Sequence, residues 1–266
     1  MKKILIPIAL LAALPLCASA ADDGNWSGSG ELGFAAARGN SKSENLNAKL
    51  EFKKEDDQWK DLFYLTALRS KGEVKTATID NGQVVNVSNY NLTSNRIETG
   101  ASLGYKLDER SYIVGALRYE HDDFSPLQYQ WVASIGYGYT VLKNQTDELS
   151  FEAGPGYKSY RPVDGVVVVD GHTVPVTVDS QSEIVARGLM AYKHAFTDNT
   201  AFIDTLLVEA GSDNTFVQND AGVQVAMSKK LALKVGYQTR YNSDVAPGLK
   251  STDQLLTTNL VYNFGK

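Results

Sequence analysis

The three histidines are the side chains of this chain best suited to acid–base chemistry near neutral pH. Asp122, Asp123 and Ser125 follow His121 closely, so one connecting loop could hold a hydrolase site. The same run, closed by Pro126, is typical of a solvent-exposed polar turn, and no other segment supplies the second half of such a site. We therefore expect no enzyme, and a surface hydrolase is the most distant alternative.

Metal binding has equally little support in the sequence. His172 and His194 have no metal-ligating neighbour at a useful spacing, and no acidic run has the spacing of a calcium loop. We expect no metal and no cofactor. The polar residues expected in the outer loops, and retained as candidates for surface contacts, are His121, Asp122, Asp123, Asp170 and His172.

Residues 1–20 have the pattern of a cleaved secretory signal peptide. Two lysines precede an apolar run, and Ala18-Ser19-Ala20 fits the rule of small residues at the cleavage site. Cleavage would leave residues 21–266 as the mature domain and remove Cys17, the only cysteine, so no disulfide is expected. The chain is mildly acidic and has no block of Lys and Arg, which argues against a nucleic-acid partner.

The elements that carry these residues are predicted to be strands. From Trp26 onward polar and apolar residues alternate with a period of two, as between Tyr129 and Val141, where aromatic and aliphatic residues share one face. We count about twelve such segments of roughly nine to thirteen residues, which is longer than the usual globular strand and suits a tilted membrane crossing. No segment after the signal is apolar enough for a membrane helix.

The lengths of the connections point to one fold. Connections after even-numbered strands are short, as at Leu107–Glu109, whereas several after odd-numbered strands are long. This segregation is typical of an all-β, transmembrane, antiparallel up-and-down barrel of about twelve strands, with both termini in the periplasm. The competing fold is a soluble secreted β-sandwich, which has no reason to segregate loop lengths in this way.

Two of the long connections are rich in valine and are predicted to form hairpins. One spans Thr76–Val87 with a turn at Asn81-Gly82, and the other spans Val163–Val178 with a turn at Asp170-Gly171. Both would rise from the same end of the barrel as a rim. An alternative for the second segment is a loop that folds into the pore or binds a partner.

The charged faces of the strands would line the lumen and either neutralise one another or form a solute path. With Leu107–Glu109 as a turn, Glu98 is predicted to face Arg118, and Arg96 to face Glu120. Both signs are well represented, so no ion selectivity is predicted. The candidate lumen residues are Glu31, Lys49, Glu51, Lys53, Arg96, Glu98, Lys106, Arg118, Glu120, Glu152, Lys158, Arg187, Lys193, Asp220, Lys234 and Arg240.

The residues also show a resemblance to a known family. The segment GNSKSENLNAKLEF, the Gly-rich alternating strands after it, and the closing DQLLTTNLVYNFG resemble the salt-induced bacterial outer-membrane proteins, a family of unknown function. The similarity spans nearly the whole mature chain. It implies an outer-membrane barrel linked to salt stress and brings no catalytic or binding residues.

The expected location is the outer membrane of a Gram-negative bacterium, with membrane lipid and the barrel assembly machinery as partners. Leu260, Tyr262 and Phe264 have the spacing of an assembly signal, although Gly265 and Lys266 follow the usual terminal aromatic residue. Two function classes are expected: a narrow pore or transporter for small solutes or ions linked to salt or osmotic stress, or a closed structural or binding barrel that acts through its outer loops.

Overall fold

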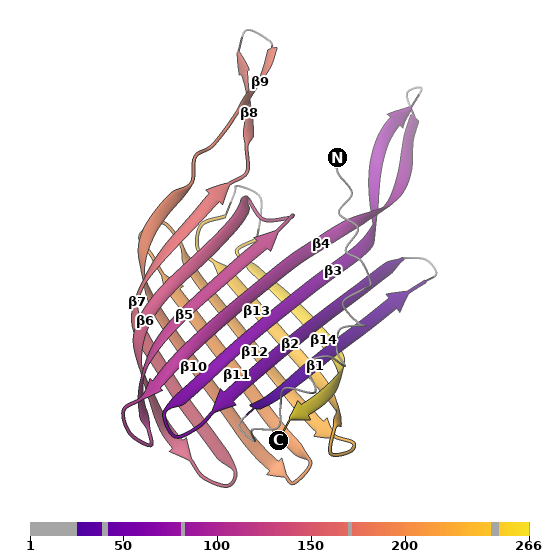
Figure 1. Ribbon diagram of the computed structural model, residues 1–266. Coiled ribbons are helices and arrows are strands. Elements are labelled where there is room, and N and C mark those ends of the chain that lie inside the picture. Colours follow the sequence, from indigo (N-terminus) through magenta and orange to yellow (C-terminus); the bar gives the residue numbers. More distant parts are fainter. Residues whose placement is uncertain (1–25, 39–41, 81–82, 170–171, 246–249, 266) are drawn as a thin grey trace.

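The computed structural model describes residues 26–38, 42–80, 83–169, 172–245 and 250–265, so the expected signal peptide lies outside it. All regular elements in these ranges are strands (Figure 1). The barrel strands are β1 (Trp26–Ala37), β2 (Ser43–Glu55), β3 (Trp59–Asp80), β4 (Gln83–Lys106), β5 (Ser111–Asp122), β6 (Leu127–Lys143), β7 (Asp147–Pro162), β10 (Gln181–Thr197), β11 (Thr200–Ala210), β12 (Thr215–Ala226), β13 (Leu231–Asn242) and β14 (Thr252–Gly265).

These twelve strands form a closed antiparallel barrel in which chain neighbours lie side by side. The first and last strands close the ring, with Glu31 of β1 opposite Val261 of β14. Closure leaves no strand edge with unpaired backbone groups, which is the condition for crossing a lipid bilayer with strands. The predicted fold class is therefore confirmed.

The two ends of the barrel differ as expected from the connections. Short turns join the strands at the end where the C-terminus lies, and long hairpins project from the other end (Figure 1). Strands β3 and β4 are 22 and 24 residues long, so the first valine-rich segment continues two barrel strands outward. The second forms a separate sheet of β8 (Gly165–Val169) and β9 (His172–Val176). Both predicted hairpin turns lie outside the described residues.

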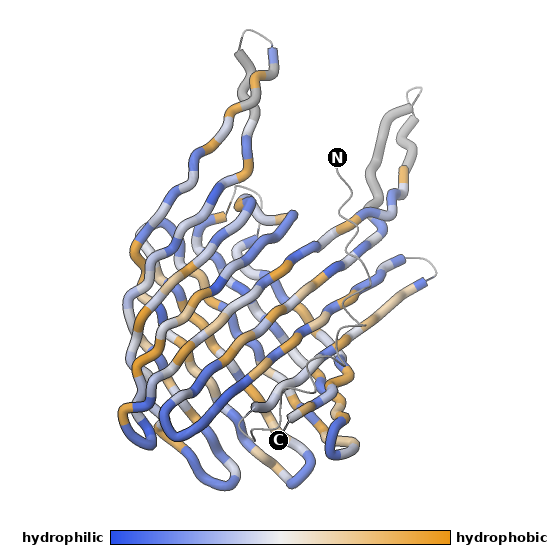
Figure 2. The backbone as a smooth tube through the Cα atoms, in the orientation of Figure 1, coloured by the Kyte–Doolittle hydropathy of each residue, from blue (hydrophilic) through white to orange (hydrophobic). Residues whose placement is uncertain are grey.

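The outward face of the barrel is apolar. Ile135, Tyr137 and Leu256 have exposed side chains on this face, and hydrophilic residues collect in the short turns (Figure 2). Aromatic pairs lie toward both ends, such as Trp59 with Tyr105 and Tyr119 with Tyr129. None of the residues in the described ranges forms a helix long and apolar enough to span a bilayer. An apolar exterior, aromatic girdles and a charged interior identify an outer-membrane barrel, the location predicted from the sequence.

The predicted register of β4 and β5 is wrong by two residues. Glu98 faces Glu120, and Arg96 faces Asp122. The reason lies in the turn, where the Asp108 carboxylate accepts hydrogen bonds from the backbone N–H groups of Arg110 and Ser111 at 2.7 and 2.8 Å. This lengthens the turn, and Arg118 consequently lies opposite Gly100, which has no side chain to contact it.

Candidate functional site: the barrel lumen

One half of the lumen, lined by β5, β6, β7, β10 and β11, is packed with side chains. Val114, Val132 and Val185 point inward and are at most 2% exposed, as in the core of a soluble protein. Large rings lie over inward glycines: a Cβ built on Gly138 would overlap the ring of Tyr112. We call this wall the packed half.

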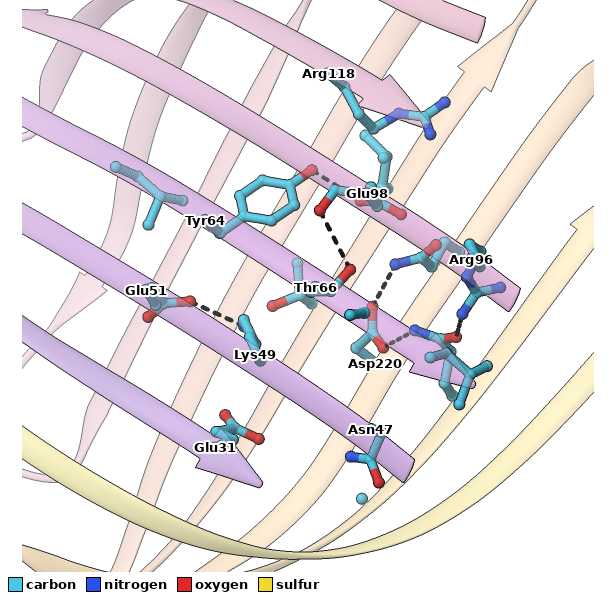
Figure 3. A pocket seen from close by; sticks show the side chains of 18 of the residues that line it. Glu31, Asn47, Lys49, Glu51, Tyr64, Thr66, Arg96, Glu98, Arg118 and Asp220 are labelled. Atoms are coloured by element: carbon cyan, nitrogen blue, oxygen red, sulfur yellow. Dashed lines mark hydrogen bonds and ion pairs between the residues drawn. The ribbon is translucent and has the colours of Figure 1, made fainter. Parts of the chain in front are cut away.

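The other half, lined by β12, β13, β14, β1, β2, β3 and β4, is polar and less filled. Amides, hydroxyls and charged groups alternate along its inward face. Glu31 accepts a hydrogen bond from Lys234 Nζ at 2.9 Å, and Glu51 pairs with both Lys49 at 2.9 Å and Lys53 at 2.7 Å (Figure 3). We call this wall the polar half.

A network of ion pairs, the brace, crosses the lumen toward the long-loop end. Arg118 of β5 donates to Glu209 of β11, with Nε to Oε1 at 3.0 Å, and to Glu120 at 2.8 Å. Glu120 also accepts a hydrogen bond at 2.6 Å from Arg240 of β13, which lies six strands away in the ring of twelve. The ring of Phe216 lies 4.8 and 5.0 Å from the two guanidinium carbons. The brace thus joins opposite walls of the barrel.

The brace separates two chambers. The inner chamber, of about 270 Å³, is lined by residues that include Glu31, Lys49 and Asp220. The outer chamber, of about 890 Å³, opens toward the long loops. Four residues line both chambers and form what we call the junction: Leu68, Arg96, Gln238 and Leu255. All four lie on the polar half, on β3, β4, β13 and β14.

Arg96 and Gln238 meet across the junction. The Arg96 Nη2 donates a hydrogen bond to the Gln238 side-chain oxygen at 2.6 Å, and the Gln238 amide nitrogen donates to Asp220 at 2.6 Å (Figure 3). Asp220 also accepts a hydrogen bond from Gln218 at 2.7 Å. A cation and an anion are thus joined through one neutral amide. Neither Arg96 nor Asp220 forms an ion pair with a described residue.

The structure places the candidate lumen residues in different parts of the barrel. The inner chamber is lined by Lys49, Glu51, Arg96, Glu98, Arg118, Arg187, Asp220 and Lys234, together with Glu31. The outer chamber is lined by Arg96, Glu120, Lys158 and Arg240. Glu152 pairs with Arg187 at 3.1 Å, Lys158 with Glu183 at 3.2 Å, and Lys106 with Glu55 at 2.9 Å. Lys53 is paired with Glu51, and Lys193 lies opposite Glu148.

Sequence reasoning missed several residues that organise this lumen. Glu209 and Phe216 complete the brace, while Gln218 and Gln238 connect the charges of the junction. Alternation along β11 would have placed Glu209 on the inner face. It could not identify Arg118 as the partner, because the two residues lie on strands four positions apart in the ring.

The outer-loop candidates do not converge on one site. Both ring nitrogens of His121 are occupied, by the Gln128 carbonyl and, at 3.0 Å, by Asp123. The Ser125 hydroxyl accepts a backbone hydrogen bond from Leu127, and none of the hydrogen bonds found among described residues joins His121 to Ser125. Asp122 lines the outer chamber, His172 is exposed on β9, and Asp170 lies outside the described residues. The described part of the chain contains no metal-binding cluster of three or more His, Cys, Asp or Glu side chains.

Solved structures with a similar fold are bacterial barrels. The translocator domain of the autotransporter NalP from Neisseria meningitidis superposes with a TM-score of 0.50 and 11% identity, covering 96% of each chain. The NanC porin gives a TM-score of 0.44 and 8% identity, covering 90% of this chain and 97% of the porin. The likeness to NalP concerns the fold alone, because the identity is low.

Two sequence matches establish the family. The uncharacterized protein YdiY of Escherichia coli (strain K12) is 23% identical over 239 residues, which cover 90% of this chain and 83% of YdiY. The model of a family described as "Protein of unknown function, DUF481" matches residues 30–264, which is nearly all of the mature chain expected from the sequence. The chain therefore belongs to the DUF481 family.

Proposed function

We propose that this protein is a narrow outer-membrane pore for small solutes, with a path along the polar half of the lumen and a constriction at the junction. The observation that carries the proposal is that the two chambers share lining residues only on the polar half, at Leu68, Arg96, Gln238 and Leu255. The path would enter the outer chamber, pass these four residues and leave through the inner chamber.

The strengths of the contacts favour this path over one through the brace. Removing one partner from a buried ion pair costs about 3–5 kcal/mol, because the other charge is left without compensation. The contact between Arg96 and Gln238 is a hydrogen bond from a charged group to an amide, worth about 1.5–3 kcal/mol. A fluctuation that admits solute therefore separates Arg96 from Gln238 before it breaks the brace.

Single-channel conductance in a planar bilayer tests the pore. Gln238→Ala shortens the side chain that closes the junction, so we expect larger discrete openings than in the wild type. Gln254→Ala, a substitution of the same type at the outer chamber, should leave conductance unchanged. The paired variant Arg96→Ala with Arg118→Ala should alter the size or the ion selectivity of the openings, because it removes charge from the junction and the brace.

A closed barrel that acts through its outer hairpins is the alternative. The brace supports it, because it joins opposite walls of the lumen, and so do the β3–β4 and β8–β9 hairpins, which project beyond the barrel end (Figure 1). Silence from the wild type and from both junction variants, with insertion verified by protease protection, would favour this alternative and reject the pore.

The proposed pore would reside among outer-membrane lipids after delivery by the barrel assembly machinery, with no cofactor and no catalytic role. The link to salt or osmotic stress rests on the resemblance described above. A deletion strain should recover more slowly than its parent after a shift to high NaCl, and a plasmid copy should restore recovery. Equal recovery of the two strains would remove the link without affecting the pore.

A further inference from the structure

We infer that the junction and the adjoining Asp220 of the inner chamber bind small zwitterionic solutes, with the carboxylate of the solute at Arg96 and its ammonium group at Asp220. This inference rests on the proposed pore and specifies the class of solute that the pore takes. Arg96 and Asp220 project from different strands, β4 and β12, and approach each other through Gln238 (Figure 3).

Most charges of the polar half are satisfied by neighbouring side chains. Glu31 is held by Lys234 and Asn259, Glu51 by Lys49 and Lys53. Glu98 accepts a hydrogen bond from the Tyr64 hydroxyl at 2.8 Å. A solute passing Glu31 or Glu51 therefore meets charges that a neighbouring cation neutralises. Such charges exert little net attraction on an ion of either sign.

Arg96 and Asp220 are held by neutral amides and not by opposite charges. Arg96 donates to the Gln238 amide oxygen, and Asp220 accepts hydrogen bonds from the amides of Gln218 and Gln238. Each of these contacts joins a charged group to a neutral amide, whereas a carboxylate at Arg96 and an ammonium group at Asp220 would add the Coulomb attraction between opposite charges. A solute that carries both charges could therefore replace Gln238 at both ends and improve each contact.

Solutes that carry a single charge fit Arg96 and Asp220 less well than a zwitterion. A monoanion that binds Arg96 remains close to Asp220, and a monocation that binds Asp220 remains close to Arg96. Each leaves the other charge without an ionic partner and faces a like charge that is joined to its binding residue through Gln238. A zwitterion satisfies both charges, so the junction discriminates by charge pattern and not by net charge alone.

Swelling of liposomes that contain the refolded barrel tests the inference at pH 7. The probes are β-alanine as the zwitterion, lactamide as an uncharged solute of similar size, sodium lactate as the anion and ethanolammonium chloride as the cation. We expect β-alanine to enter fastest in the wild type, by about tenfold over either ion, as expected for one additional hydrogen bond between charged groups.

Two charge-neutralising variants locate the effect. Arg96→Gln should lower β-alanine entry and raise ethanolammonium entry, whereas Asp220→Asn should lower β-alanine entry and raise lactate entry. Asp253→Asn, a matched substitution at the outer chamber, should keep the order found for the wild type. Opposite changes from the two variants are not expected if the residues act only on stability.

The outcomes separate this inference from the pore on which it rests. Wild-type entry of β-alanine no faster than lactamide, or unchanged order in both charge variants, would overturn the zwitterion site and leave the pore intact. Absence of swelling with all four probes, together with absence of conductance, would instead reject the pore.

Discussion

In the packed half of the barrel inward valines are almost fully buried and the ring of Tyr112 lies over a glycine, whereas in the polar half amides and charged groups include the four residues that line both chambers. Both halves have the same strand alternation and the same apolar exterior. The difference lies in the polarity of the inward residues, because valines pack closely in one half and long charged side chains extend along the wall in the other, while both halves have a tyrosine ring over a glycine, Tyr112 over Gly138 and Tyr64 over Gly100. One barrel can thus have both a close-packed wall and a polar wall.

A substitution in the brace should cause the largest loss of stability if the packed half behaves as a core. Arg118→Leu leaves Glu209 and Glu120 without their main partner at a nearly dehydrated position, so we expect a loss of about 3–5 kcal/mol in the free energy of unfolding. Urea-induced unfolding of the barrel in lipid vesicles, followed by tryptophan fluorescence, measures it.

Two controls accompany this variant. Arg38→Ala removes an exposed pair with Glu44, which should cost at most about 1 kcal/mol. The double variant Arg118→Leu with Glu209→Leu should recover part of the loss, because both buried charges are then absent. Equal losses for Arg118→Leu and Arg38→Ala would show that the brace is well solvated.

A substitution at a glycine covered by an aromatic ring should cause the second largest loss of stability. Gly138→Ala places a methyl group where the ring of Tyr112 lies, and overpacking of this kind costs about 1–3 kcal/mol. Gly115→Ala, on the outward face of β5 with no atom near the added methyl group, should cause little change in the same unfolding measurement.

The cause of that loss can be checked by a second substitution. Tyr112→Leu in the Gly138→Ala background should lower the cost of the glycine substitution, because the overlapping ring is gone. If the cost is the same with and without the tyrosine ring, contact between the two residues does not explain it.

A single ion pair of the polar half should matter less. Lys234→Met removes the partner of Glu31, but Asn259 still donates to that carboxylate at 3.0 Å and the inner chamber lies beside it. We expect a loss of about 1 kcal/mol, which decreases as NaCl screens the pair. A loss as large as that of Arg118→Leu would remove the distinction between the halves.

The turn between β4 and β5 belongs to neither half, and a substitution there should change stability least. Backbone N–H groups of Arg110 and Ser111 lower the pKa of Asp108 below its usual value. The pKa is lower in the folded than in the unfolded chain, so the stabilisation is present above the unfolded value and is lost as the pH falls through the folded one.

Asp108→Asn should therefore reduce the loss of stability between pH 5 and the pH region below about 4, measured by unfolding at each pH. Glu109→Gln, in the same turn, serves as the control. An unchanged pH profile for Asp108→Asn would mean that these backbone contacts do not persist in the lipid-bound barrel.

The third strand shows how far alternation extends. Phe63, Leu65 and Arg69 share a parity, so alternation alone does not assign the faces of this segment. In the structure these residues lie on the outer face, with Arg69 toward the long-loop end of the barrel, while Tyr64 and Leu68 line the inner chamber. A charge on the outer face is tolerated there because it lies beyond the centre of the apolar band.

Alternation by itself predicted the all-β class and which face of most strands points outward, because a strand exposes successive side chains to opposite sides. The segregated connection lengths predicted the closed barrel, and the composition of two long connections predicted the valine-rich hairpins. The tertiary structure alone decided the partners inside. The Asp108 turn shifted Glu98 away from Arg118, and ring closure brought Arg118 to Glu209 and Arg240 to Glu120. Which residues meet across a lumen depends on the combined register of all the strands between them. The alternation within one strand does not contain this information.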